Sequence, residues 1–273
     1  MSAAISQTQS PATVFIFAHQ DDEYAVNSRI RFEVGLGNEV QCVYLTNGVG
    51  WRARRGLTQE KRDRESLAVL RSYGVRPENI YFLGSELGVN DMSLIDHACD
   101  ARSRCTDLLS NLAPRISAIY TLAWEGGHPD HDACHLVVTC AALELGLVPI
   151  SRQFSLYNGC GVPKPFFRVM NPLHPALFVD RQLSIREALS SSMQCWRYPS
   201  QLRTWAGLFP EAFLKWSLPP RERVMRLDPK IALARPHAGQ LLYERMFERR
   251  SFEDFSQRAK HLTSRIAAMI PAH

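Results

Sequence analysis

The stretch VFIFAHQDDE, from Val14 to Glu23, begins as a buried strand and ends in an imidazole, an amide and three carboxylates. The apolar run is typical of a strand that is covered on both faces. Packing gives no reason for the acids, because charged side chains are rarely buried unless they are paired or bind a ligand. The end of this stretch is therefore a candidate functional site.

The segments that follow alternate between strand and helix patterns. Strand patterns occupy residues 14–19, 39–48, 79–84, 116–124 and 152–158, and helical patterns occupy residues 23–38, 57–74, 93–112 and 131–146. This alternation predicts an α/β fold with a Rossmann-like, mostly parallel sheet and helices on both faces. Ligands bind beyond the carboxyl ends of the strands in such sheets, which places the acids after Val14–Phe17 at that edge.

Composition sets broad limits on the kind of protein. The chain has 273 residues, is 45% hydrophobic and 22% charged, and has a net charge of +5 with a pI near 8.9. These values are ordinary for a globular protein with one large domain. The mild positive charge permits an anionic ligand but does not require nucleic acid, and we expect none.

Compartment and oligomeric state are constrained less strongly. The first residues lack the pattern of a signal peptide, and no apolar run approaches the ~20 residues that span a bilayer. Seven cysteines, an odd number, are scattered without a CxxC pair, which predicts reduced and mostly buried thiols in a cytoplasmic protein. A homo-oligomer is compatible with the sequence.

A second polar cluster occurs in EGGHPDHDACH, residues 125–135. It also lies where a predicted strand gives way to a predicted helix, so both clusters are expected at one edge of the sheet. Either cluster alone also fits a turn followed by a helix cap. Their coincidence at matching strand ends favours a functional site, with these candidate residues: His19, Asp21, Asp22, Glu23, His128, Asp130, His131, Asp132 and His135.

Imidazoles and carboxylates together suit a divalent metal such as zinc. A catalytic zinc site uses ~3 protein ligands from His and Asp or Glu and leaves a position for water. The metal lowers the pKa of that water from ~15.7 to about 7. A carboxylate outside the ligand set is then available as a base, and a spare imidazole as an oxyanion donor.

The two motifs AHQDDE and HPDH resemble the paired signature of the PIG-L/LmbE-like zinc-dependent de-N-acetylases, usually written AHPDDE and HPDH. The resemblance covers the first ~150 residues in element order. It implies removal of the acetyl group from an N-acetylglucosamine-type sugar conjugate by a metal-activated water. The implied zinc ligands are His19, Asp22 and His131.

The resemblance also implies roles for neighbouring residues. Asp21 would be the general base, His128 would stabilise the oxyanion, and Asp130 would orient His128. Glu23 would supply a hydrogen bond behind the motif. His135, one helical turn after His131, is an alternative ligand.

Weaker matches suggest contacts with the substrate. Arg62, three residues before Glu65, matches an R-x-x-E pattern whose arginine reaches sugar hydroxyls, and Asp91 matches a sugar-binding aspartate. Two positions depart from the family pattern. Gln20 replaces the usual proline, and Trp124 stands near the position of a tyrosine that some members carry before HPDH.

The C-terminal half is less regular. Residues 161–178 are rich in proline, residues 183–200 predict a helix, and residues 205–220 place aromatic residues between prolines. The resemblance is weak after Gly161. We interpret residues 1–160 as the α/β catalytic core and residues 161–273 as a C-terminal extension that completes the same domain and shapes the substrate pocket.

Two stretches leave the substrate open. The basic segment after residue 50 favours a nucleotide- or phosphate-linked amino sugar through Arg52, Arg54, Arg55, Lys61, Arg62 and Arg64. The aromatic stretch 205–220 fits an apolar aglycone pocket, a subunit interface or plain core packing. Contact with a membrane surface is the least favoured alternative, because only Arg203 and Lys215 supply positive charge.

Three other functions compete with a de-N-acetylase. They are an amide hydrolase of the same fold acting on another N-acyl or thiol conjugate, a non-catalytic sugar- or nucleotide-binding protein, and an NAD-type oxidoreductase. The first strand ends in HQDDE and not in a G-x-G-x-x-G turn, which argues against the oxidoreductase.

Overall fold

The computed structural model describes residues 10–50, 56–247 and 250–271. Its centre is a seven-stranded sheet in the order β3-β2-β1-β4-β5-β9-β8. The strands are β1 (Ala12–Phe17), β2 (Glu39–Tyr44), β3 (Ile80–Tyr81), β4 (Ile116–Leu122), β5 (Ser151–Phe154), β8 (Phe178–Gln182) and β9 (Arg221–Arg226). The first five are parallel, and β9 pairs antiparallel with both β5 and the edge strand β8. The predicted Rossmann-like, mostly parallel sheet is confirmed.

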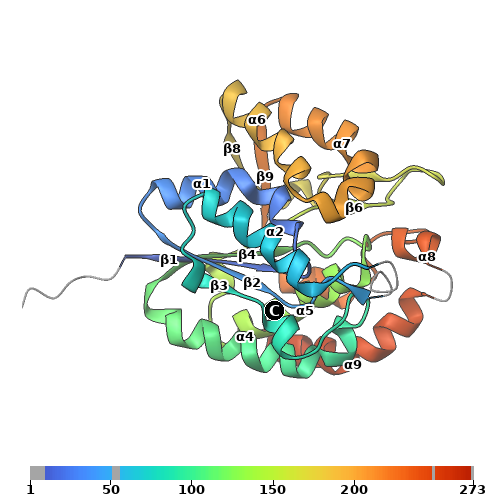
Figure 1. Ribbon diagram of the computed structural model, residues 1–273. Helices are drawn as coiled ribbons and strands as arrows, with labels where there is room; N and C mark the ends of the chain where they lie inside the picture. Colours follow the sequence, from blue (N-terminus) through green and yellow to red (C-terminus); the bar gives the residue numbers. More distant parts are fainter. Residues whose placement is uncertain (1–9, 51–55, 248–249, 272–273) are drawn as a thin grey trace, which may run out of the picture.

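Helices cover both faces of the sheet (Figure 1). Helices α1 and α2 lie on one face and α4 and α5 on the other, with α9 packed against α5. The helices are α1 (Asn27–Gly35), α2 (Gln59–Ser72), α3 (Leu83–Glu86), α4 (Ala98–Leu112), α5 (Pro129–Glu144), α6 (Ile185–Ser192), α7 (Leu202–Ser217), α8 (Leu242–Met246) and α9 (Phe252–Met269). The crossovers after β1, β2, β3 and β4 therefore follow the predicted alternation.

Strand β1 is the centre of the core. Every one of its residues is buried, and it pairs in parallel with both β2 and β4. Its Phe15 ring stacks on Tyr120 of β4 at 4.7 Å between centroids. The continuous apolar run of this strand follows from burial on both faces. Because β1 and β4 are neighbours, their carboxyl ends lie side by side.

The second half of the chain differs from the sequence-based expectation in its details. The predicted strand 152–158 is divided between β5 and β6 (Tyr157–Asn158), and β6 pairs with β7 (Arg168–Val169) in a separate two-stranded sheet. The predicted helix 183–200 ends at Ser192 and continues as 3-10 turns. Strands β8 and β9 were not predicted, and they extend the central sheet.

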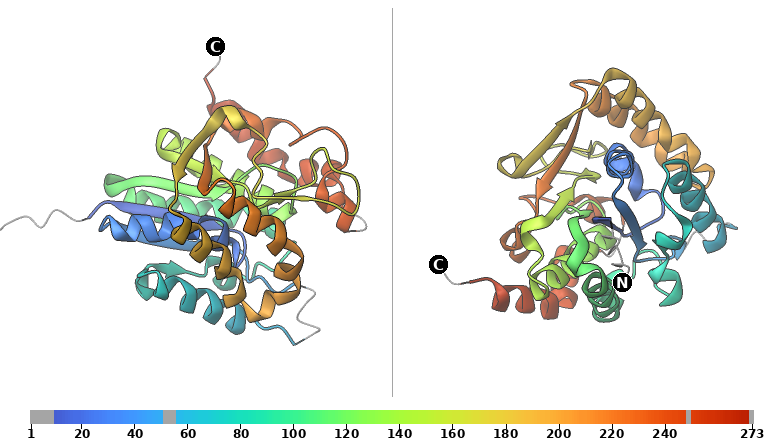
Figure 2. Two further views of the ribbon diagram at one scale, coloured as in Figure 1. Left: turned by 90° about the horizontal axis from the view of Figure 1, so that it is seen from above. Right: turned by 90° about the vertical axis from the view of Figure 1, so that its left-hand side faces the viewer.

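Helix α7 was also not predicted, because Pro210 lies inside it. Proline removes one backbone hydrogen bond from a helix interior. The helix forms because its apolar face is buried, with Trp205 and Trp216 each at most 1% exposed. In Figure 1, α6 and α7 lie at the top of the view beside β8 and β9, the last two strands of the sheet, and Figure 2 shows the same group from two further sides.

Two general expectations can be compared with the structure. The seven cysteines are free and five of them are buried, as expected for reduced thiols. Among the described residues, no helix is both long and apolar enough to cross a membrane.

Strand β9 is tied to the core by a buried carboxylate. Glu222 is 1% exposed and accepts hydrogen bonds from Arg29 Nε of α1 at 3.1 Å and from Arg181 Nε of β8 at 3.0 Å. Each arginine is itself less than a fifth exposed. The carboxylate is therefore shared by two largely desolvated guanidinium groups, each of which also contacts a second acid, Glu33 for Arg29 and Glu187 for Arg181.

Replacing Glu222 with alanine should leave both arginines without this partner and lower the free energy of unfolding by about 3 kcal/mol. Urea denaturation followed by circular dichroism measures this change. Glu253→Ala, at an exposed position of α9, is the control and should leave the midpoint unchanged. Equal midpoints for Glu222→Ala and the wild type would show that the ion pair contributes nothing.

Candidate metal centre and active site

The carboxyl ends of β1 and β4 bring the two sequence motifs together. His19 follows β1, and His128 and His131 lie at the start of α5, directly after β4. The ring centroids are 4.8 Å apart for His19 and His128, 5.3 Å for His19 and His131, and 5.1 Å for His128 and His131. All three side chains are buried. Residues more than a hundred positions apart in sequence thus form one compact cluster.

Asp22 lies between two of these imidazoles. Its Oδ1 is 3.3 Å from Nε2 of His131, and its Oδ2 is 3.7 Å from Nδ1 of His19. Oδ2 also accepts the backbone N–H groups of Ala18 at 3.1 Å and His19 at 2.8 Å. Burial by itself raises the pKa of Asp22, but His131 and His19 outweigh it and lower the pKa to about 2. Asp22 is therefore a fixed carboxylate.

His19 faces two further carboxylates on its other nitrogen. Nε2 lies 3.1 Å from Asp130 Oδ2 and 3.2 Å from Asp91 Oδ1. Burial lowers the pKa of His19, but hydrogen bonds to Asp130 and Asp91 and the charge of Asp22 together raise it well above its usual value. Carboxylates that favour a proton at this point also favour a metal cation, because both carry positive charge.

Asp130 makes different contacts from those that the family pattern implied. Its Oδ2 accepts the N–H of Met92 at 2.6 Å, and its Oδ1 accepts the N–H of Leu94 at 3.0 Å. Because its Oδ2 also contacts His19 Nε2, the carboxylate of Asp130 orients both His19 and the loop before α4. Its contact with His128 is through the backbone, since the Asp130 N–H donates to His128 Nδ1 at 3.2 Å. The assignment of Asp130 as the residue that orients His128 stays a prediction.

His128 is the N-cap residue of α5, followed by a proline at the first helical position. Its Nδ1 accepts a hydrogen bond, so the ring proton of the neutral form is on Nε2. Burial and the nearby charge of His19 lower the pKa of His128 to about 3. His128 is therefore a neutral imidazole with a donor N–H, and this N–H lies 3.6 Å from Asp91 Oδ1.

Two groups of ligand atoms in the described part of the chain are close enough to share an ion. They are His19, His128 and His131, and His19, Asp91, His128 and Asp130, with ligand atoms within 4.8 Å of one another. Asp22 falls outside both groups by that distance but contacts His19 and His131. Imidazole nitrogens and carboxylate oxygens are suitable zinc donors. The residues present therefore fit a divalent metal.

The alternative ligand His135 lies outside these groups. Its Nδ1 hydrogen-bonds the carbonyl oxygen of Leu122 at 2.9 Å, and its ring is fully buried near Trp124. Burial lowers the pKa of His135 to about 4. The structure supports a core position for His135 and gives no support to a ligand role.

Asp21 is held beside the metal cluster in an unusual backbone conformation, with φ 107°. Its N–H donates to Glu23 Oε2 at 2.9 Å, which is the hydrogen bond expected behind the motif. Its Oδ1 accepts from Arg62 Nη2 at 3.0 Å, and its Oδ2 accepts from Trp205 Nε1 at 3.1 Å. The non-glycine positive φ is the kind of strain that functional sites retain.

A cavity of about 410 Å³ opens onto this cluster. Part of its wall is polar and comes from the motif residues with Arg62 and Asp91, and the rest is largely apolar. The residues after position 160 that line it are Phe167, Gln201, Thr204, Trp205, Gly207, Leu208, Leu242, Met246 and Phe247. Of the aromatic stretch 205–220, Trp205 and Leu208 reach the cavity, Trp216 is buried elsewhere, and Leu214 is exposed.

Tyr157 is a site residue that sequence reasoning missed. Its ring lies 5.2 Å from that of His131, and it lines the cavity. The sequence feature that could have identified Tyr157 is its position at the carboxyl end of the predicted strand 152–158. Trp124, which stands near the tyrosine position of some relatives, instead donates its indole N–H to Ala234 O at 2.9 Å and packs on Phe255.

The basic segment is only partly placed. Arg52, Arg54 and Arg55 lie outside the described residues. Lys61 and Arg64 are not among the residues that line the cavity, whereas Arg62 lines it and is 3% exposed. The predicted phosphate contact therefore remains a prediction.

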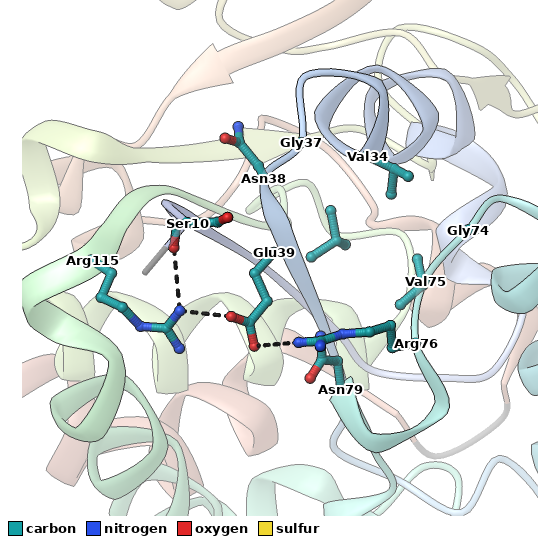
Figure 3. Close-up of a pocket in the computed structure, with 11 residues that line it drawn as sticks. Ser10, Val34, Gly37, Asn38, Glu39, Gly74, Val75, Arg76, Asn79 and Arg115 are labelled. Carbon is teal, nitrogen blue, oxygen red and sulfur yellow. Dashed lines mark hydrogen bonds and ion pairs between the residues drawn. The ribbon is translucent and has the colours of Figure 1, made fainter. Parts of the chain in front are cut away.

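A second cavity, of about 500 Å³, lies at the amino ends of β1 and β2 (Figure 3). Its two arginines both contact Glu39, at 2.6 Å for Arg115 and 3.1 Å for Arg76. The figure shows Glu39 between them, and Arg76 also contacts Glu78 at 3.6 Å, so both arginines have acidic partners within the protein. This cavity lies at the opposite ends of the strands from the imidazole cluster and is therefore not part of the site described above.

Gly127 is required by close packing beside His128. A Cβ atom at this position would lie 1.9 Å from the backbone oxygen of Tyr157. Gly127→Ala should therefore push β6 away from the start of α5 and lower the free energy of unfolding by about 2 kcal/mol, as overpacking does. Thermal denaturation measures this. Gly35→Ala, where a Cβ meets nothing within 4 Å, is the control, and equal destabilisation of both variants would contradict the argument.

Several solved structures with a similar fold are deacetylases of low sequence identity. The A40926 pseudoaglycone deacetylase Dbv21 is 18% identical with a TM-score of 0.58, and the match covers 81% of this chain and 99% of that one. The zinc-inhibited form of the teicoplanin deacetylase Orf2 is 15% identical with a TM-score of 0.57, covering 80% and 99%. N,N'-diacetylchitobiose deacetylase from Pyrococcus horikoshii is 16% identical with a TM-score of 0.50, covering 80% and 85%. These likenesses establish the fold.

No curated protein sequence matches the chain. Residues 14–142 match the family model described as "PIG-L: GlcNAc-PI de-N-acetylase". The matched range begins in β1 and ends in α5, so it contains both motifs and all three clustered imidazoles. The resemblance indicated by the two motifs is thus confirmed over residues 14–142, which match the PIG-L domain.

Proposed function

We propose that this protein is a zinc-dependent hydrolase that removes the N-acetyl group from an N-acetylglucosamine-type sugar conjugate. The observation that carries the proposal is the buried contact of Asp22 with His19 and His131. These residues line one cavity together with Asp21 and His128. The PIG-L match over residues 14–142 and the deacetylase structures of similar fold support the reaction class.

His19, Asp22 and His131 are the proposed metal ligands. Zinc bound there would supply a water of low pKa and polarise the acetyl carbonyl. Asp22 is kept in place by two backbone N–H groups, which orients it toward both imidazoles. Asp91, whose Oδ1 contacts His19 and His128, is a candidate for a further ligand as well as for the predicted contact with the sugar.

Asp21 and His128 are the proposed proton-handling and oxyanion groups. Asp21 accepts the proton of the attacking water on a carboxylate oxygen, and Arg62 and Trp205 hold that carboxylate in place. His128 donates its Nε2–H to the carbonyl oxygen as negative charge develops there. Because His128 is buried and neutral, it acts as a hydrogen-bond donor without bringing a second positive charge next to the metal.

The cavity wall indicates what else the substrate carries. The residues opposite the polar cluster are mainly apolar, and they include Phe167 and Leu208 from the C-terminal extension. We therefore propose an amino sugar joined to an apolar group, with Arg62 contacting the sugar. Arg62 lines the cavity next to Asp21, which supports its assignment as the residue that contacts a sugar hydroxyl. The extension, residues 161–273, would in this way shape the substrate pocket.

A phosphate- or nucleotide-linked amino sugar and another N-acyl or thiol conjugate are the competing substrates, and a panel containing each class distinguishes them by rate. The cytoplasm is the proposed location, because all seven cysteines are free thiols.

Replacing Asp21 with alanine should keep the metal but lower kcat for acetate release by about 10²–10⁴-fold, because the base is lost while the ligands stay. Metal content by elemental analysis and acetate release on N-acetylated sugars are measured on the same sample. His131→Ala is the matched variant and should lose both metal and activity. Near-normal turnover in metal-loaded Asp21→Ala would show that Asp21 is not the base.

The apolar wall can be tested with two adjacent phenylalanines. Phe167 lines the cavity, whereas Phe166 is 64% exposed outside it. Phe167→Ala should raise KM about tenfold for a conjugate with an apolar aglycone and leave KM for free N-acetylglucosamine unchanged. Phe166→Ala should change neither value. If the wild type prefers phosphate-linked over apolar conjugates, the proposed substrate class is wrong.

A further inference from the structure

We propose that Trp205 is a positioning residue for Asp21, which means that a side chain outside the family-matched range 14–142 is required for full turnover. The proposal rests on the function proposed above, in which Asp21 is the general base. It starts from one contact: the indole N–H of Trp205 donates to Asp21 Oδ2 at 3.1 Å.

The Asp21 carboxylate has a donor on each oxygen. Arg62 Nη2 holds Oδ1 at 3.0 Å, and Trp205 Nε1 holds Oδ2. The terminal torsion of an aspartate is soft and has a broad range of angles. One donor leaves the carboxylate free to pivot, whereas two donors on different oxygens define its plane. A base whose plane is fixed keeps its lone pairs aimed at one point, which reduces the reorganisation needed for proton transfer.

The backbone of Asp21 cannot supply this restraint. Its positive φ and the hydrogen bond from its N–H to Glu23 fix where the side chain begins. They do not fix the terminal side-chain torsion, about which the carboxylate group rotates. Arg62 supplies one restraint from α2, and the indole supplies the other from α7. The indole is only a donor, so it cannot reverse the direction of this hydrogen bond.

Trp205 is itself held by packing. It is 1% exposed, and its ring lies 4.3 Å from that of Tyr24, whose hydroxyl donates to Ser192 O at 3.1 Å. The turn before α7 is fastened to α2, because Glu65 accepts the backbone N–H of Ser200 at 3.0 Å. Helix α7 therefore presents the indole from a fixed position.

The chain contains a matched control. Trp216 lies on the same helix, is fully buried, and packs on the same Tyr24 ring at 6.4 Å. Its indole nitrogen has no hydrogen-bond partner among the described residues. Trp205→Phe and Trp216→Phe remove the same atoms from the same helix, but only the first removes a donor to Asp21.

We expect metal-loaded Trp205→Phe to show kcat about tenfold below wild type, with KM nearly unchanged for free N-acetylglucosamine, which does not reach the apolar wall, and Trp216→Phe to show wild-type kcat. Replacing Trp205 with its benzothiophene isostere, which exchanges N–H for sulfur at nearly constant shape, should reproduce the loss without a cavity. In an Asp21→Ala background, Trp205→Phe should cause no further loss. A wild-type kcat for the isostere, or an equal loss in the Asp21→Ala background, would overturn the proposal.

A second readout needs no turnover. The five tryptophans give five indole N–H signals in a ¹⁵N-labelled sample, and Trp205→Phe and Trp216→Phe assign two of them. Asp21→Ala should shift the Trp205 signal and speed its exchange with solvent, while the Trp216 signal stays in place. An unmoved Trp205 signal would refute the contact. Absence of deacetylase activity in the wild type with a shifted signal would refute the proposed function but not the contact.

Discussion

The compensation of buried charge at the carboxyl ends of β1 and β4 is the constraint on which the rest of the site depends. Three imidazoles and the carboxylates of Asp22 and Asp130 are each less than a tenth exposed there. Buried charges are tolerated only when they are paired, hydrogen-bonded or bound to a metal. Backbone N–H groups and imidazoles supply such partners here, and the proposed metal ion would supply a further one. The surrounding elements are placed where they can provide these partners.

The sequence predicted those elements whose structure follows from the pattern of neighbouring residues. Strand β1 was predictable because a strand buried on both faces has an unbroken apolar run. Helices α2 and α5 were predictable from the helical spacing of their apolar residues and from their capping residues. The functional edge of the sheet followed from the order of these elements. The meeting of His19 with His131 followed from topology alone, because β1 and β4 are parallel neighbours. Strands β8 and β9 and helix α7 were not predictable, since long-range pairing forms the first two and Pro210 conceals the third.

Individual side-chain contacts were harder to predict than the cluster itself. The carboxylates of Asp91 and Asp130 meet at His19, because the loop between α3 and α4 places Asp91 there and directs two backbone N–H groups at Asp130. No local pattern encodes the path of that loop. The contact between Trp205 and Asp21 joins residues 184 positions apart, and an interior tryptophan on an apolar helix face carries no signal of a polar role.

Gln20 shows how a departure from the family motif is accommodated. The usual proline would fix φ at this turn. Here the Gln20 side chain donates from Nε2 to Asp63 Oδ1 at 2.7 Å, so the turn is fastened to α2 by a hydrogen bond. Arg62, the residue before Asp63, contacts Asp21 at the next position of the motif. Gln20 and Asp21 are therefore both anchored to the same helical turn, and a backbone restraint lost with proline is replaced by a tertiary one. The same turn of α2 supplies the hydrogen bonds to Gln20 and to the Asp21 carboxylate. A small shift of α2 would therefore act on the motif loop and on this carboxylate in the same direction.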